Sequence, residues 1–217
     1  MYLQQCHRVI AASKWTQQIL QKYGVESEQM YFYANTEDLL SDEIVEKKDQ
    51  IIQVSRFVPH KRFEVAQEAV KSLDVQLVNV GRVRGESPYY NQLRATAPPN
   101  VVFMPNLARD QMIAEVRRSK VLVSSSTFEG WGLSPIEALM LKVPIIVNDL
   151  PVFREQYADT VLYYDVNNPV TLRAQMNKLL TNDALQKQIV IEAGRRISNY
   201  TPQSFTSRWT EMIERVL

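Results

Sequence analysis

The sequence predicts an α/β protein built on a doubly wound parallel sheet of about six strands, a Rossmann-like fold. Short runs rich in valine and isoleucine are apolar on both faces, as buried parallel strands are. Amphipathic segments of helical period alternate with these runs after residue 50, and this alternation is typical of parallel sheets covered by helices. The 217 residues are enough to bury a substantial core.

A short strand–helix–strand stub is expected before this sheet, over residues 1–34. Its predicted strands are 8–12 and 30–34. The helix between them should begin after Ser13 and end at Gly24, because serine is a favoured N-cap and glycine a favoured C-terminal stop. Residues 35–49 are rich in acidic side chains and are predicted to be a linker, with a short amphipathic helix as the alternative.

The remaining elements follow in regular order. The predicted strands are 51–55, 75–80, 100–104, 120–124, 144–147 and 160–164. The predicted helices between them are 62–73, 87–96, 109–118, 134–142 and 151–157. Three further helices are expected at 169–180, 183–197 and 204–216. We therefore assign residues 50–200 to one ligand-binding domain and 201–217 to a C-terminal helix.

Composition narrows the classes of function. The formal net charge of +1 disfavours a nucleic-acid binder, which needs an excess of cations. Cys6 is the single cysteine, which rules out a disulfide framework and fits a reducing compartment. No apolar run approaches the roughly 20 residues of a membrane-spanning helix. We expect a cytoplasmic protein without nucleic-acid partners, and peripheral contact with a membrane stays open.

The segment 126–138 carries the strongest functional signal. It follows the strand 120–124 and leads into a helix, so it lies where parallel sheets bind ligands. Gly130 and Gly132, two of only six glycines, let the backbone approach a ligand closely. Ser134, Pro135 and Glu137 fit a capping box, and the N-terminus of the helix is a natural anion site. That Glu137 only caps its own helix is the alternative.

With Glu129 and Glu137 enclosing Gly-Trp-Gly-Leu, this segment resembles the signature of retaining GT-B glycosyltransferases, within the family 4 group (glycosyl transferases group 1). Residues 52–61, 77–81 and 101–107 resemble, in the same order, parts of the donor-binding C-terminal domain of these enzymes. The strand 144–147 and the later Glu155 continue that likeness. Where the family commonly has glycine, the chain instead carries Thr36, Arg62, Pro105 and Lys142.

The resemblance implies a role for each matching residue. Arg56 and Lys61 bind the diphosphate of a nucleotide sugar and Glu129 holds the sugar, so these three are the implied catalytic residues. The charge on a departing diphosphate makes fixed cations useful there. Leu107 meets the nucleobase and Glu137 the ribose. The full set of implied donor-binding residues is Ser55, Gly81, Leu107, Gly130, Trp131, Gly132, Leu133 and Glu137.

The implied function is donor binding in a retaining hexosyltransferase, such as a mannosyltransferase or glucosyltransferase, that moves a sugar to an acceptor hydroxyl. No metal or other cofactor is expected, because basic residues take the place of a cation and the chain offers no cluster of metal ligands. Residues 1–34 resemble only the end of the family's N-terminal acceptor domain. We therefore expect activity to need that domain or a partner chain. The alternative is a non-catalytic nucleotide-sugar-binding or regulatory subunit.

Overall fold

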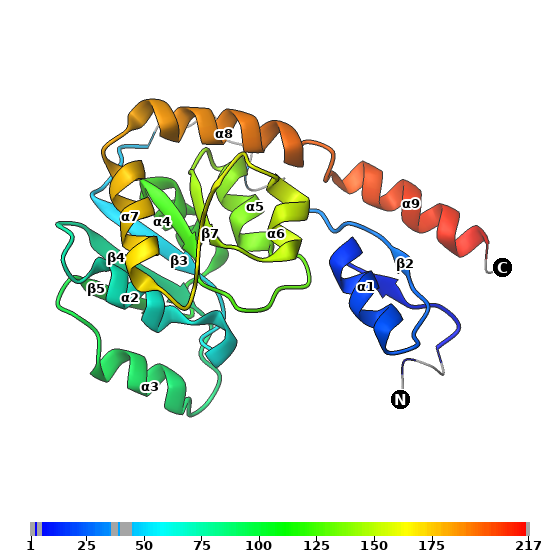
Figure 1. Ribbon diagram of the computed structural model, residues 1–217, viewed down its shortest axis with the longest axis horizontal. Helices are drawn as coiled ribbons and strands as arrows, with labels where there is room; N and C mark the ends of the chain where they lie inside the picture. The colour runs from blue at the N-terminus through cyan, green and yellow to red at the C-terminus, as the bar shows by residue number, and fades with distance from the viewer. Residues whose placement is uncertain (1–2, 4–5, 36–38, 40–44, 216–217) are drawn as a thin grey trace.

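Six parallel strands form the main sheet of the computed structural model, which describes residues 3, 6–35, 39 and 45–215. The strands run in the order β5-β4-β3-β6-β7-β8 (Figure 1). Their bounds are β3 Gln50–Val54, β4 Gln76–Gly81, β5 Val101–Pro105, β6 Val121–Ser124, β7 Ile145–Asn148 and β8 Leu162–Tyr164. The doubly wound sheet is therefore confirmed, and each predicted strand overlaps an observed one.

Helices cover both faces of this sheet. The helices of this part of the chain are α2 Phe63–Val70, α3 Pro88–Ala95, α4 Arg109–Arg118, α5 Leu133–Met140, α6 Pro151–Tyr157, α7 Pro169–Leu180 and α8 Asp183–Ile197. Helices α2 and α7 pack together on one face, while α4 and α5 lie on the other and α8 packs over α5 and α6 (Figure 1). Two positions where the family commonly has glycine, Arg62 and Lys142, adopt left-handed φ angles of 47° and 58°. Glycine enters this region more easily than other residues, so Arg62 and Lys142 hold a less favourable backbone conformation than glycine would.

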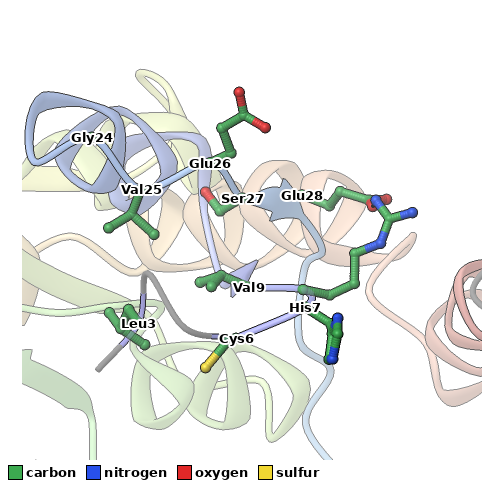
Figure 2. A pocket seen from close by; sticks show the side chains of 10 residues that line it. Leu3, Cys6, His7, Val9, Gly24, Val25, Glu26, Ser27 and Glu28 are labelled. Atoms are coloured by element: carbon green, nitrogen blue, oxygen red, sulfur yellow. The ribbon is translucent and has the colours of Figure 1, made fainter. Parts of the chain in front are cut away.

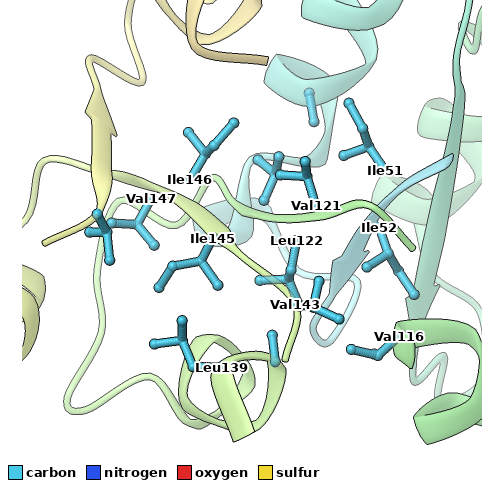
Figure 3. Packing of buried hydrophobic residues seen from close by; sticks show 14 of the residues in the cluster. Ile51, Ile52, Val116, Val121, Leu122, Leu139, Val143, Ile145, Ile146 and Val147 are labelled. Carbon is cyan, nitrogen blue, oxygen red and sulfur yellow. The ribbon is translucent and has the colours of Figure 1, made fainter. Parts of the chain in front are cut away.

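The core lies on both sides of the central strands. Consecutive residues such as Ile51 and Ile52 in β3, or Ile145 and Ile146 in β7, are all fully buried. Figure 3 shows these side chains pointing alternately to the two helical layers. Burial of each such side chain stabilises the fold by about 1.5–3 kcal/mol. This double burial is why the strands lack an apolar–polar alternation.

The N-terminal unit is a separate two-stranded parallel sheet. Strand β1 Ile10–Ala11 pairs with β2 Glu28–Gln29, and α1 Lys14–Lys22 connects them. The predicted caps are confirmed: the Ser13 side chain accepts from the third residue after it, and Gly24 ends the helix with a φ of 69°. A cavity of about 370 Å³ opens on this unit between residues 6–9 and 24–28 (Figure 2).

The predicted strand at 30–34 is wrong. Strand β2 ends at Gln29, and residues 30–34 continue outside any strand. The aromatic side chains of this segment are used in packing instead. Tyr31 stacks on Trp131, and Tyr33 lies 5.2 Å from Phe205 between ring centres. Aromatic residues favour positions on a half-buried surface. A strand can provide such a surface, but so can packing against a helix or a loop, as it does here.

The predicted linker and the C-terminal helix lie on either side of the main sheet in the chain. Residues 36–38 and 40–44, most of the predicted linker, lie outside the described residues. Helix α9, Pro202–Glu214, begins two residues earlier than predicted and returns over the N-terminal unit (Figure 1). Within the described part of the chain, no helix is both long and apolar enough to cross a membrane.

Candidate functional site

The candidate site lies at the carboxyl ends of β3 and β6, the two central strands. The chain runs outward from β3 through β4 to β5, then returns to β6 and runs the other way through β7 to β8. Open parallel sheets bind ligands where the strand order reverses in this way. The loops after β3 and β6 meet here, because Thr127 donates from its backbone N–H to the His60 carbonyl at 2.9 Å.

Lys61 and Glu129 meet at the centre of the site. The Lys61 Nζ donates to Glu129 Oε1 at 2.6 Å, and the two side chains are only 9% and 15% exposed. Ser126 Oγ donates to the same carboxylate oxygen at 2.8 Å. The Lys61 carbonyl in turn accepts from the buried Gln53 side chain at 3.0 Å. The structure thus brings together two predicted site residues that are far apart in the chain. Hydrogen bonds from neighbouring side chains hold both residues in position.

Positive charge collects around this pair. Burial and the nearby charge of Lys61 lower the pKa of His60 from its ordinary value of 6.5, while Glu129 opposes the shift. Arg56 also lowers this pKa, so its guanidinium is within electrostatic reach of His60. Because Arg56 is exposed and follows β3 directly, it remains available to an anion at the mouth of the site.

The predicted capping box at Ser134 is wrong. Helix α5 starts at Leu133, with Gly132 as N-cap at a φ of 84°, so Ser134 is its second residue. The left-handed glycine turns the chain into the helix two residues before the serine. No side chain caps α5 among the described residues, which leaves N–H groups of its first turn open to a ligand.

Glu137 pairs with a residue that the sequence analysis did not single out. Its carboxylate accepts from Arg109 Nη1 at 3.0 Å, and the side chains of Glu137 and Arg109 are 17% and 42% exposed. Arg109 begins α4, just after the partly buried Leu107, so this contact brings the loop after β5 to the signature segment. Arg109 looks like an ordinary polar helix residue in the sequence, and no local signal marks it.

The two glycines with the tightest surroundings serve packing. A Cβ on Gly81 would lie 1.9 Å from the Ser55 carbonyl oxygen, so β3 and β4 can approach only because this residue is glycine. A Cβ on Gly132 would lie 2.6 Å from the Phe153 ring. A Cβ on Gly130, by contrast, would meet no heavy atom within 4 Å.

The Trp131 ring is buried against aromatic side chains from distant segments. It is 4% exposed, stacks on Tyr31 at 4.8 Å and meets the edge of Tyr200 at 4.9 Å. The Trp131 carbonyl accepts from the Gln156 side chain. The ring therefore anchors the signature loop against the N-terminal unit and the start of the connection to α9. Only the backbone of this residue is left for a ligand.

The sequence model of the family "Glycosyl transferases group 1" matches residues 35–196, well over half of the chain. The chain belongs to this family. It is 27% identical over 174 residues to the O-antigen chain mannosyltransferase RfbU of Salmonella typhimurium, covering 75% of this chain and 48% of RfbU. A shorter stretch of 70 residues is 31% identical to the serotype-specific mannosyltransferase WbdA of Escherichia coli, covering 32% of this chain and 9% of WbdA.

Several solved structures share the fold of this chain. Sucrose-phosphate synthase from Thermosynechococcus elongatus matches 99% of this chain and 59% of its own, with a TM-score of 0.86 and 15% identity. Anabaena HepE in complex with UDP and glucose matches 96% of this chain and 63% of its own, with a TM-score of 0.85 and 16% identity. The six-stranded sheet is thus that of a GT-B glycosyltransferase domain, and the chain spans about half the length of RfbU.

Proposed function

We propose that this chain is the donor-binding part of a retaining, family 4-like hexosyltransferase that takes a sugar from a nucleoside-diphosphate sugar. One observation carries the proposal. The buried Lys61–Glu129 pair lies at the reversal point of the sheet, in the segments that carry the resemblance. The uncapped N-terminus of α5 starts only four residues after Glu129 in the same loop.

Lys61, Arg56 and the first-turn amides of α5 bind the donor diphosphate. An ammonium has three N–H donors, and the structure gives Lys61 one bond, to Glu129. The remaining donors can reach a phosphate without breaking that pair. Amides around Gly130, Trp131, Gly132 and Leu133 add uncharged donors, and the helix dipole adds to the positive potential.

Glu129 holds hydroxyls of the donor sugar and stabilises positive charge that develops on its ring. In the transfer, the bond from the anomeric carbon to the diphosphate oxygen breaks, and a bond to the acceptor oxygen forms on the same face. The acceptor hydroxyl proton passes to the departing diphosphate. Lys61 stabilises the charge on that leaving group, which is the main electrostatic demand of the step. The chemistry needs no resident metal or cofactor.

Glu137 binds the ribose, and Leu107 meets the nucleobase through apolar and backbone contacts. The Arg109 contact supports this role, because it holds the Glu137 carboxylate at one end of the site. Ser55 and Gly81 contact the donor through their backbone at the ends of β3 and β4, which the missing Cβ of Gly81 lets lie close together. Mannose is the first sugar to test, since RfbU and WbdA are mannosyltransferases by name, and glucose is the second, because HepE was solved with UDP and glucose.

Calorimetry with UDP-, GDP- and ADP-sugars tests donor binding. We expect one nucleotide class to bind the wild-type chain, and Lys61→Ala to weaken that binding at least about 10-fold, as loss of a charged hydrogen bond does. Lys71→Ala is the matched control, because Lys71 forms an exposed ion pair with Glu68 on α2. Binding of no nucleotide sugar, or equal binding by Lys61→Ala, would reject the proposal.

We also propose that transfer needs an N-terminal acceptor domain or a partner chain. Adding such a domain to the purified chain should produce transfer that the chain alone lacks. A chain that binds donor but transfers nothing in any combination would instead favour the non-catalytic subunit. The cytoplasmic location stays a prediction from composition.

A further inference from the structure

A second cavity lies next to the residues that pack on the Trp131 ring. Its volume is about 300 Å³, at the lower end of the range for small-molecule pockets. It lies where the N-terminal unit, the end of α8 and the start of α9 come together. The residues that line it are Tyr31, Arg196, Asn199, Tyr200, Ser204, Phe205 and Arg208.

Two guanidinium groups line this cavity without a carboxylate partner. Across the residues that the structure describes, neither Arg196 nor Arg208 forms an ion pair, and Arg196 Nε donates to the Gln156 carbonyl at 3.1 Å. Glu155 lies beside the lining residue Tyr31, and its two oxygens accept from the first two backbone N–H groups of α1 at 2.9 and 3.1 Å. The cavity therefore holds an excess of positive charge.

The rest of the lining suits a hydroxylated ring. Tyr31, Tyr200 and Phe205 supply aromatic surface, and Asn199 and Ser204 supply hydrogen-bonding side chains. Guanidinium groups favour phosphate, since each offers several N–H donors in a planar fork. We propose that this cavity binds a phosphorylated monosaccharide, with the phosphate between Arg196 and Arg208 and the sugar against the aromatic side chains.

Two residues that line the cavity also pack against Trp131 in the signature loop. These are Tyr31 and Tyr200, which both pack on Trp131 and on each other. Arg196 reaches the same loop through Gln156, whose carbonyl it binds and whose side chain donates to the Trp131 carbonyl. A ligand that orders these groups restrains the Trp131 ring, so binding is reported by tryptophan emission. Occupancy of the donor site is not required for this effect.

Calorimetry with glucose 6-phosphate, glucose and inorganic phosphate tests the assignment on the purified chain. We expect glucose 6-phosphate to bind at least about 10-fold more tightly than either of its parts, because the lining engages both. Arg208→Gln removes no hydrogen bond that the structure describes, so the fold should be kept while affinity falls about 10-fold. Arg195→Gln, at an exposed neighbouring position outside the lining, is the matched control and should change affinity less than about twofold.

Trp131→Phe should retain glucose 6-phosphate binding and reduce the emission change, the remainder coming from Trp209, which stacks on the lining residue Phe205. Three results overturn the proposal: no heat up to about 10 mM ligand, which corresponds to a binding free energy weaker than about 3 kcal/mol; equal affinity for inorganic phosphate and the sugar phosphate; or equal affinity in Arg208→Gln and the wild type. Each is independent of whether a nucleotide sugar binds at the donor site.

Discussion

Replacement of Gly132 tests the described shape of the signature loop. The φ of 84° lies in a region where side chains cost about 1–3 kcal/mol. An alanine Cβ would also lie 2.6 Å from Phe153 Cε1 and 3.2 Å from its Cζ. Forcing a carbon into a packed core destabilises by about 1–3 kcal/mol more. Gly132→Ala should therefore lower the free energy of unfolding by about 2–6 kcal/mol in total.

Urea and thermal unfolding measure this loss. For a chain of this size, the melting temperature should fall by about 4–24 °C. Gly130→Ala, two residues earlier, is the control: its φ is not positive, and a Cβ there meets no heavy atom within 4 Å. It should change stability by less than about 0.5 kcal/mol. Equal losses for the two variants, or no loss for Gly132→Ala, would refute the packing account of these glycines.

Contacts elsewhere in the chain support three further predictions. A double-mutant cycle with Lys61→Met and Glu129→Gln should give a coupling energy of about 1.5–3 kcal/mol in unfolding experiments, and a value near zero would contradict the ion pair. The pKa of His60 is lowered from 6.5 in the folded protein, so the folded state binds a proton at His60 less tightly than the unfolded state does. The contribution of His60 to the free energy of unfolding should therefore fall as the pH drops through 6.5. In NMR titrations with His7 as reference, a bound diphosphate should raise the pKa of His60, because an anion favours the imidazolium; an unchanged pKa would place the anion elsewhere. Glu155→Gln should destabilise the N-terminal unit by about 0.3–1 kcal/mol through loss of the carboxylate at the start of α1, seen as faster amide exchange in α1 and unchanged exchange in α4.

Local patterns were enough to predict most of the fold. Runs such as Ile51–Ile52 and Ile145–Ile146 are apolar on both faces and can be satisfied only in a covered sheet. Ser13 and Gly24 mark the ends of α1 through backbone preferences that act within a few residues. The strand at 30–34 was wrong because its aromatic side chains pack against rings from distant segments, which no local pattern reveals.

The site was predictable in part. The sequence indicates Lys61 and Glu129 as site residues, but their direct contact joins positions 68 residues apart and depends on the order of the strands. Arg109 was missed for the same reason, since its contact with Glu137 is set by how α4 and α5 meet. The start of α5 was misplaced because the left-handed conformation of Gly132 outweighs a serine that would otherwise make a good cap.

The packing of Trp131 also has a consequence for synthesis of the protein on the ribosome. Its ring packs against Tyr31, which precedes the six strands of the main sheet in the chain, and against Tyr200, which follows all of them. The signature loop can therefore complete its packing only after the segment that holds Tyr200 has been made. In a nascent chain, this loop is expected to become resistant to proteolysis later than the strands beside it.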